Sequence, residues 1–226
     1  MAYYRVTKKQ SGGGSGAIVP TFTETVLVDN SALNTSFTFS SDYHNYDFIR
    51  IKLYNSSYTR YSYLLTTPSS IDATFDITTV LLVNEYNTNQ ACNYSESGLT
   101  WTRTWNRNCN IYEIVGLTCT NATVNETEIY KAISYSGTAV SITTQEDLMG
   151  YDWIIFTAND SAYDEVMFCP NMFVPSASIL NANLYENQKS KYDFCVYGNN
   201  GARTVWIDNH TISADAYAYV IGINFT

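Results

Sequence analysis

Positive charge is scarce in this chain. Its 226 residues include 12 Lys and Arg against 21 Asp and Glu, so the formal net charge at pH 7 is −9. Proteins that bind nucleic acid need basic patches to neutralise the phosphates. The composition therefore argues against a nucleic-acid partner.

Motifs of enzymes and metal sites are also missing. The two histidines, His44 and His210, lie in polar, turn-like sequence, and neither has a second histidine at ligand spacing. No Gly-x-Ser-x-Gly, P-loop or dinucleotide-binding pattern occurs. We therefore expect no metal, no cofactor and no enzymatic activity. The acidic pairs at 146–147 and 164–165 leave a glycosidase as a minority alternative, because that reaction uses paired carboxylates.

Long apolar runs are absent as well. No segment approaches the ~20 apolar residues that a membrane span requires. The basic N-terminus is not followed by the apolar run of a secretory signal. We therefore expect a protein that is made in the cytoplasm and is not inserted into a membrane.

The five cysteines form no Cys-x-x-Cys pair and are odd in number. Without an export signal, reduced thiols are expected, with Cys119 and Cys195 in strand-like surroundings. Cys92 and Cys109 bracket a loop with two tryptophans and are the preferred bridge if the protein becomes oxidised. Neither should be bridged to Cys169 or Cys195, since independent domains seldom share a disulfide.

The residues that are abundant favour β-structure. Thr, Ser, Asn and Tyr are frequent, which suits strands and turns. Apolar and charged residues alternate over 49–53, which predicts a strand with Ile49, Ile51 and Leu53 on one buried face. The segment 216–225 alternates in the same way, with an apolar face from Tyr217 to Phe225. For the alternating segment 111–119, the predicted shared face is Ile111, Glu113, Val115, Leu117 and Cys119.

Two segments of the chain resemble each other at an offset of 105 residues. They are NYDFIRIKLYNSSY, residues 45–58, and GYDWIIFTANDSAY, residues 150–163. The identical pairs are Tyr46/Tyr151, Asp47/Asp152, Ile49/Ile154, Ser56/Ser161 and Tyr58/Tyr163. Roughly one identity is expected by chance, so a repeat is the leading explanation.

A second pair of segments follows in the same order. IYEIVGLTCT, residues 111–120, aligns with YVIGINFT, residues 219–226, and pairs Gly116 with Gly222. A period near one hundred residues fits a whole small domain, and short strands between turns indicate a β-sandwich. We predict an all-β fold of two tandem β-sandwich modules, Ig-like or jelly-roll-like, over residues 22–120 and 127–226.

The N-terminus differs from the modules. The segment MAYYRVTKKQ carries three cations and is followed by SGGGSG, a flexible linker. Residues 1–16 are predicted to be a docking arm on a tether, with a disordered tail as the alternative. The residues predicted to dock are Tyr3, Tyr4, Arg5, Val6, Lys8 and Lys9.

Tyrosine is frequent, with 20 residues. Tyr together with Asn, Ser and Thr is typical of adaptable recognition surfaces. The clusters Tyr54/Tyr58/Tyr61/Tyr63 and Trp101/Trp105 could stack on a sugar or form a subunit interface, and the alternative is ordinary core packing. The residues predicted to contact a glycan or a partner are Tyr58, Tyr61, Trp101 and Trp105.

A basic arm, a glycine-rich tether and β-modules with repeated Tyr-Asp strands together resemble small virion proteins of tailed bacteriophages, of the fibre, tail-tip and head-appendage or decoration types. The resemblance implies an arm that anchors to the particle and β-domains that project outward. It also implies a location in the virion. The partners that it implies are capsid, portal or tail proteins and further copies of the chain, and the ligand is a host-surface glycan. The alternative is a free carbohydrate-binding module or cell-surface adhesin, which needs an export signal or anchor.

Overall fold

The computed structural model consists mostly of β-strands, which confirms the predicted all-β class. It describes residues 18–57, 59–75, 80–83, 91–131, 140–143, 150–160, 165–168, 172–173, 193–196, 203–208, 211–214 and 217–226. The elements up to residue 119 are β1 (Phe22–Asp29), β2 (Ser36–Thr38), η1 (Tyr43–Asn45), β3 (Phe48–Asn55), β4 (Arg60–Thr66), α1 (Pro68–Phe75), β5 (Val80–Val83), β6 (Ala91–Ser97), β7 (Thr100–Arg107) and β8 (Cys109–Cys119). Those that follow are β9 (Val124–Lys131), β10 (Val140–Thr143), β11 (Trp153–Asp160), β12 (Glu165–Phe168), β13 (Met172–Phe173), β14 (Asp193–Val196), β15 (Arg203–Asp208), β16 (Thr211–Ala214) and β17 (Tyr217–Phe225).

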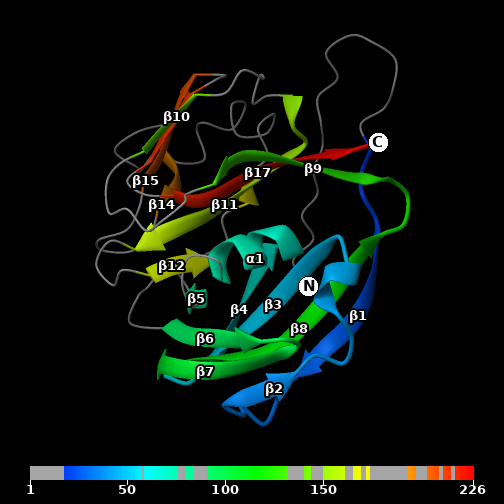
Figure 1. Cartoon of the computed structure of the whole chain (residues 1–226), viewed down its shortest axis with the longest axis vertical. Helices are drawn as coiled ribbons and strands as arrows, with labels where there is room; N and C mark the ends of the chain where they lie inside the picture. Colours follow the sequence, from blue (N-terminus) through cyan, green and yellow to red (C-terminus); the bar gives the residue numbers. More distant parts are fainter. Residues whose placement is uncertain are drawn as a thin grey trace.

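The described strands form three sheets (Figure 1). One four-stranded sheet has the order β1-β8-β3-β4, and another has the order β10-β16-β15-β14. The third sheet has nine strands in the order β2-β7-β6-β5-β12-β11-β17-β9, and β13 also pairs with β11. Among the described strands, every pairing is antiparallel except that of β5 with β12.

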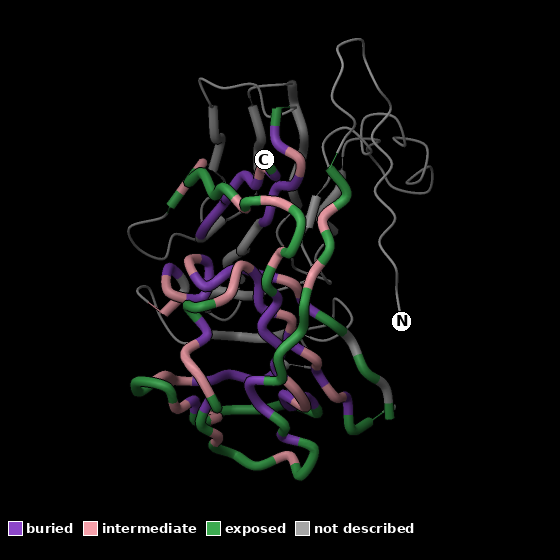
Figure 2. Tube along the Cα trace, turned by 90° about the vertical axis from the view of Figure 1, so that its right-hand side faces the viewer, coloured by how far each residue is buried: buried purple, intermediate pink, exposed green. Residues whose placement is uncertain are grey.

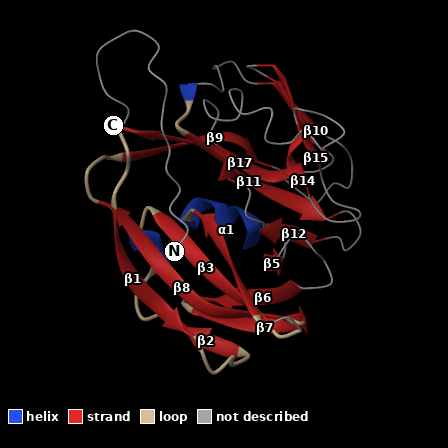
Figure 3. Cartoon of the chain, turned by 180° about the vertical axis from the view of Figure 1, so that it is seen from behind, coloured by secondary structure: helices blue, strands red, loops and turns tan. Residues whose placement is uncertain are grey.

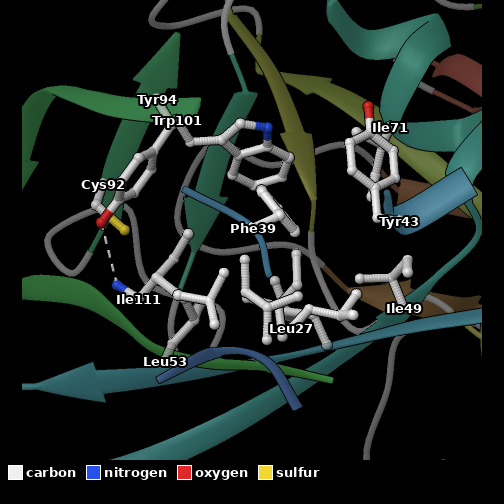
Figure 4. Close-up of a cluster of buried hydrophobic side chains, with 14 of the residues drawn as sticks. Leu27, Phe39, Tyr43, Ile49, Leu53, Ile71, Cys92, Tyr94, Trp101 and Ile111 are labelled. Atoms are coloured by element: carbon white, nitrogen blue, oxygen red, sulfur yellow. Dashed lines mark hydrogen bonds between the residues drawn. The ribbon is translucent and has the colours of Figure 1, made fainter. Parts of the chain in front are cut away.

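The first sandwich core lies between the β1-β8-β3-β4 sheet and the β2-β7-β6 strands. Ile49, Ile51 and Leu53 point from β3 into this core and are fully buried, as the alternation of 49–53 predicts. They join a cluster that includes Tyr94 from β6 and Trp101 from β7 (Figure 4). Burial of each large apolar side chain stabilises the fold by about 1.5–3 kcal/mol. The pattern of buried and exposed positions along the chain is visible in Figure 2.

The prediction for residues 111–119 was wrong at one end. Val115, Leu117 and Cys119 do share the outer face of β8, but Ile111 lies in the sandwich core. The cause is a β-bulge: Glu113 pairs with Lys52 and Ile111 pairs with Leu53, so Tyr112 is an extra residue. An extra residue reverses the alternation of faces beyond it.

The arrangement of strands is repeated along the chain. The order β1-β8-β3-β4 in the first half corresponds to β9-β17-β11-β12 in the second half. The order β2-β7-β6-β5 corresponds in the same way to β10-β16-β15-β14. The bulge at Tyr112 also recurs, because Thr157 pairs with Tyr219 and Ala158 with Tyr217, which leaves Ala218 as the extra residue.

The repeated Tyr-Asp sequence has the same contacts in both halves. The ring of Tyr46 covers Gly116, and the ring of Tyr151 covers Gly222, so closely that a Cβ at either glycine would overlap the ring. The Asp47 carboxylate accepts a hydrogen bond from the Cys119 N–H at 2.7 Å, while the Asp47 N–H donates to the Leu117 carbonyl at 3.0 Å.

Asp152 repeats this clasp on β17. Its carboxylate accepts from the Phe225 N–H at 3.0 Å, and its N–H donates to the Ile223 carbonyl at 2.9 Å. The tyrosine and the aspartate of each repeat therefore fix the start of β3 or β11 against its neighbouring strand. Their recurrence in the sequence therefore has a structural cause.

The two halves pack together through equivalent faces. Phe48 of β3 and Trp153 of β11 hold equivalent positions, and their ring centroids lie 5.4 Å apart. Around them lies a buried cluster that includes Val115 and Leu117 from β8 and their counterparts on β17. These counterparts are Ile221 and Ile223. Contact between equivalent faces is the geometry of an isologous interface, here within one chain.

The parallel pairing of β5 with β12 joins the two halves into one continuous sheet. The division into modules at 22–120 and 127–226 stays a prediction. The strand order is repeated between the two halves of the chain, as described above. The arm at residues 1–16, with the six residues predicted to dock, lies outside the described residues. In the described part of the chain, no helix is both long and apolar enough to cross a membrane.

Candidate functional site

An exposed group of tyrosines lies on the outer face of the β1-β8-β3-β4 sheet, at the end away from the contact with β11 and β17. Figure 3 shows β1, β8 and β3 of this sheet side by side. Tyr61 and Tyr63 on β4 are 44% and 51% exposed. Together with three neighbours they form what we call the tyrosine patch. Its members are Lys52, Tyr54, Tyr61, Tyr63 and Tyr112.

The register of the strands builds the patch. Tyr54 on β3 pairs directly with Tyr61 on β4, and Lys52 pairs with Tyr63. Directly paired residues of an antiparallel sheet lie on the same face with Cβ atoms about 4.5–5.5 Å apart. The fourth tyrosine comes from β8, where the bulge places Tyr112 beside Tyr61.

The rings and the lysine are in close contact. The centroid of Tyr61 lies 5.0 Å from that of Tyr112, edge to face, and 5.3 Å from that of Tyr54. The Lys52 Nζ lies 4.4 Å from the centroid of Tyr61 and 4.6 Å from that of Tyr112. Such cation–π contacts contribute roughly 0.5–1 kcal/mol at exposed sites. The lysine is therefore held in place between two rings.

Tyr112 keeps its proton at physiological pH. The hydrogen bond with Tyr61 raises the pKa of Tyr112 most, and the electrostatic effect of Tyr61, desolvation and the negative charges of Asp29 and Glu113 act in the same direction. Its hydroxyl is already hydrogen-bonded to Tyr61, and its oxygen can accept a hydrogen bond from a ligand. The patch thus brings together aromatic rings, tyrosine hydroxyls and one cation on the outer face of the sheet.

A second polar cluster joins η1 to α1. The His44 Nδ1 lies 2.6 Å from Asp42 Oδ1, and its Nε2 lies 3.0 Å from Asp72 Oδ1. Partial burial acts to lower the pKa of His44, but hydrogen bonds to Asp42 and Asp72 outweigh it and the pKa lies above its usual value. Because carboxylates occupy both ring nitrogens, this imidazole is not poised to take a proton from a substrate.

The same cluster continues into the core through Tyr43. Its hydroxyl lies 3.0 Å from both Asp72 Oδ1 and Glu96 Oε1, and the Trp101 Nε1–H donates to Glu96 Oε1 at 3.0 Å. These contacts join η1, α1, β6 and β7. Among the described residues, no group of three or more His, Cys, Asp or Glu is arranged to hold a metal ion. We interpret this cluster as a structural network.

The predicted contact residues have different outcomes. Tyr61 lies in the tyrosine patch, whereas Tyr58 lies outside the described residues. Trp101 is fully buried in the core, so its assignment as a contact for a glycan or a partner is corrected. Trp105 is 43% exposed and pairs with Asn93, so it faces away from the core on the other sheet.

The sequence cluster at 54–63 located part of the patch but missed two members. Tyr112 is distant in the sequence, and its position depends on the bulge in β8. Lys52 lies in the alternating segment 49–53, which places it on the face opposite to Ile49, Ile51 and Leu53. The pairing of 52 with 63 follows once a hairpin between β3 and β4 is assumed, so the lysine could have been found.

Comparisons of the chain with models of known protein families, with curated proteins and with solved structures give no match.

Proposed function

We propose that this chain is a non-enzymatic attachment protein of a bacteriophage particle. Residues 1–16 dock it to the capsid, portal or tail, and the tyrosine patch binds a glycan on the host surface. The protein is made in the host cytoplasm and acts in the virion. The observation that carries the ligand-binding part is the group of four tyrosines beside Lys52 on the outer face of the sheet, of which Tyr61 and Tyr63 are exposed.

The chemistry of the patch favours a sugar chain as the ligand. The face of an aromatic ring carries negative partial charge, and it attracts the C–H groups on the apolar face of a sugar ring. The ammonium of Lys52 supplies donors for the sugar oxygens, and the tyrosine hydroxyls add further polar groups. An open sheet surface accommodates an extended chain of sugars better than a small molecule, which needs a concave pocket.

The glycan part is tested with two variants at one position of the patch. Tyr61→Ala removes the ring that contacts Lys52, Tyr54 and Tyr112, whereas Tyr61→Phe keeps the ring and loses only the hydroxyl. On an array of purified bacterial surface polysaccharides, we expect the unmodified chain and Tyr61→Phe to bind the same glycans. Tyr61→Ala should weaken that binding roughly 30-fold, as the loss of a central aromatic contact does.

The docking part is tested in the same series with a chain that lacks residues 1–16. This chain should keep its glycan binding but no longer copurify with phage particles. Equal glycan binding by Tyr61→Ala and the unmodified chain would refute the role of the patch. Copurification of the truncated chain with particles would refute the role of the arm. Binding of a glycan without any particle association would instead indicate a free carbohydrate-binding module.

A further inference from the structure

Two buried thiols face each other between the sheets of the first sandwich. Cys92 lies on β6 and Cys109 begins β8, both are fully buried, and their sulfur atoms are 3.5 Å apart. Both cysteines are free thiols in the structure. We propose that Cys92 and Cys109 are a disulfide-forming pair, and that their bond joins the two sheets when the chain folds in the presence of a disulfide oxidant.

The neighbouring contacts hold the two strands in the register that this bond needs. Two residues further along each strand, the Ile111 N–H donates a hydrogen bond to the Tyr94 hydroxyl at 3.2 Å (Figure 4). This bond and the sulfur contact are successive connections between β6 and β8. A disulfide has an S–S bond of about 2.05 Å, so the sulfur atoms must approach each other by roughly 1.5 Å. Side-chain rotation can supply a movement of that size.

The reaction is two steps of thiol–disulfide exchange. The thiolate of one cysteine attacks a low-molecular-weight disulfide such as oxidised glutathione, forming a mixed disulfide and releasing one thiolate. The thiolate of the second cysteine attacks the protein sulfur of the mixed disulfide and releases the second small thiolate. The two protein thiols lose two protons and two electrons, and the small disulfide is reduced to two thiols.

The folded protein restricts when this reaction occurs. Burial raises the pKa of Cys92, and the neighbouring Cys109 thiol raises it further, so little thiolate forms in the closed core. Full burial also keeps an oxidant away from both sulfurs. The bond therefore forms while the chain folds, before β6 and β8 enclose the sulfur atoms. The same burial then protects the completed bond from reductants.

The proposal is tested on the full-length chain, unfolded and reduced and then refolded either in a glutathione redox mixture or in excess reductant. Protein refolded with glutathione should be 2 Da lighter for each disulfide, and non-reduced peptide mapping should link Cys92 to Cys109. A disulfide that closes a loop of this length raises Tm by roughly 5–10 °C in a chain of this size.

The matched variants are Cys92→Ala, which removes one partner, and Cys119→Ala, which removes a half-buried thiol elsewhere on β8. Cys119→Ala should keep the difference in Tm between the two refolding conditions, and Cys92→Ala should lose it. The peptide map of the unmodified chain decides the matter even if Cys92→Ala does not fold. Three outcomes would each overturn the proposal. They are the absence of a link between residues 92 and 109, a link from either residue to another cysteine, and a linked protein whose Tm is unchanged.

Discussion

Replacement of the two glycines under the tyrosine rings tests whether the repeated Tyr-Gly contact holds each half together. A Cβ at Gly116 would lie 2.5 Å from the ring of Tyr46, and a Cβ at Gly222 would overlap the ring of Tyr151. Gly116→Ala and Gly222→Ala therefore force a ring or a strand to move. Gly150→Ala is the matched control, since no heavy atom lies within 4 Å of its added Cβ.

The expected loss of stability follows from overpacking. Inserting a methyl group into a filled site costs about 1–3 kcal/mol, whereas Gly→Ala in open space is neutral or stabilises by up to about 1 kcal/mol. Tyr151 is only 7% exposed and Tyr46 is half-buried, so the ring over Gly222 has less room to move. We therefore expect Gly222→Ala to lose more stability than Gly116→Ala, and Gly150→Ala to lose none.

The assay is urea unfolding followed by tryptophan fluorescence, with Tm measured in parallel. A loss of 2 kcal/mol lowers Tm by roughly 4–8 °C in a chain of this size. The double variant Gly116→Ala, Tyr46→Ala removes the ring that the new methyl group meets, so its loss should be smaller than the sum of the two single losses. Additive losses, or equal midpoints for Gly116→Ala and Gly150→Ala, would refute the contact as the cause.

Two further predictions concern the histidine cluster and the tryptophans. The raised pKa of His44 means that its contribution to stability is complete below a pH of about 6.5 and is lost as the pH rises through the folded-state value. The free energy of unfolding from urea titrations should therefore fall more from pH 6 to pH 8.5 in the unmodified chain than in His44→Gln. The difference should be well under 1 kcal/mol because the side chain is 46% exposed. Trp101→Ala should lower the free energy of unfolding by about 3–5 kcal/mol, and Trp105→Ala should lower it by less than about 0.5 kcal/mol. Comparable losses for the two variants in thermal unfolding would contradict the burial of Trp101 and the exposure of Trp105.

The strands with regular alternation were predictable from the sequence. Ile49, Ile51 and Leu53 occupy one buried face, and four residues of the predicted face of β17 are buried against the first half of the chain: Tyr219, Ile221, Ile223 and Phe225. Tyr217, the first residue of that predicted face, lies beyond the bulge at Ala218 and is outside the regular alternation. A period of two residues follows directly from the geometry of an extended chain. The prediction failed at Ile111 because one extra residue in a strand leaves no mark in composition.

The helix α1 was not predicted, although a local signal exists. Thr67 precedes Pro68, and the Thr67 side-chain oxygen accepts a hydrogen bond from the Ser70 N–H at 3.3 Å. A threonine N-cap followed by proline at the first helical position is a known start signal. The frequent Ser and Thr of this chain conceal it, since the same residues also occur in its strands and turns.

The placement of Trp101 shows why sequence clusters are weak predictors of a surface. The spacing of Trp101 and Trp105 would place them on the same face of a regular strand. A register shift between Asn93 and Tyr94, opposite β7, turns Trp105 away from the core instead. A similar bulge in β8 places Tyr112 in the patch and Ile111 in the core. Prediction of this surface from sequence therefore requires the positions of the bulges.

The second half of the chain supplies an internal comparison for the tyrosine patch. The register of β11 with β17 matches that of β3 with β8, and it includes the same bulge. At the bulge, Ala218 stands in place of Tyr112, and Thr157 stands in place of Lys52. Because the same strand pairing and bulge form without the tyrosine and the lysine, the fold does not require these side chains on the outer face. Their presence in the first half is therefore compatible with the glycan-binding role that we propose for the patch.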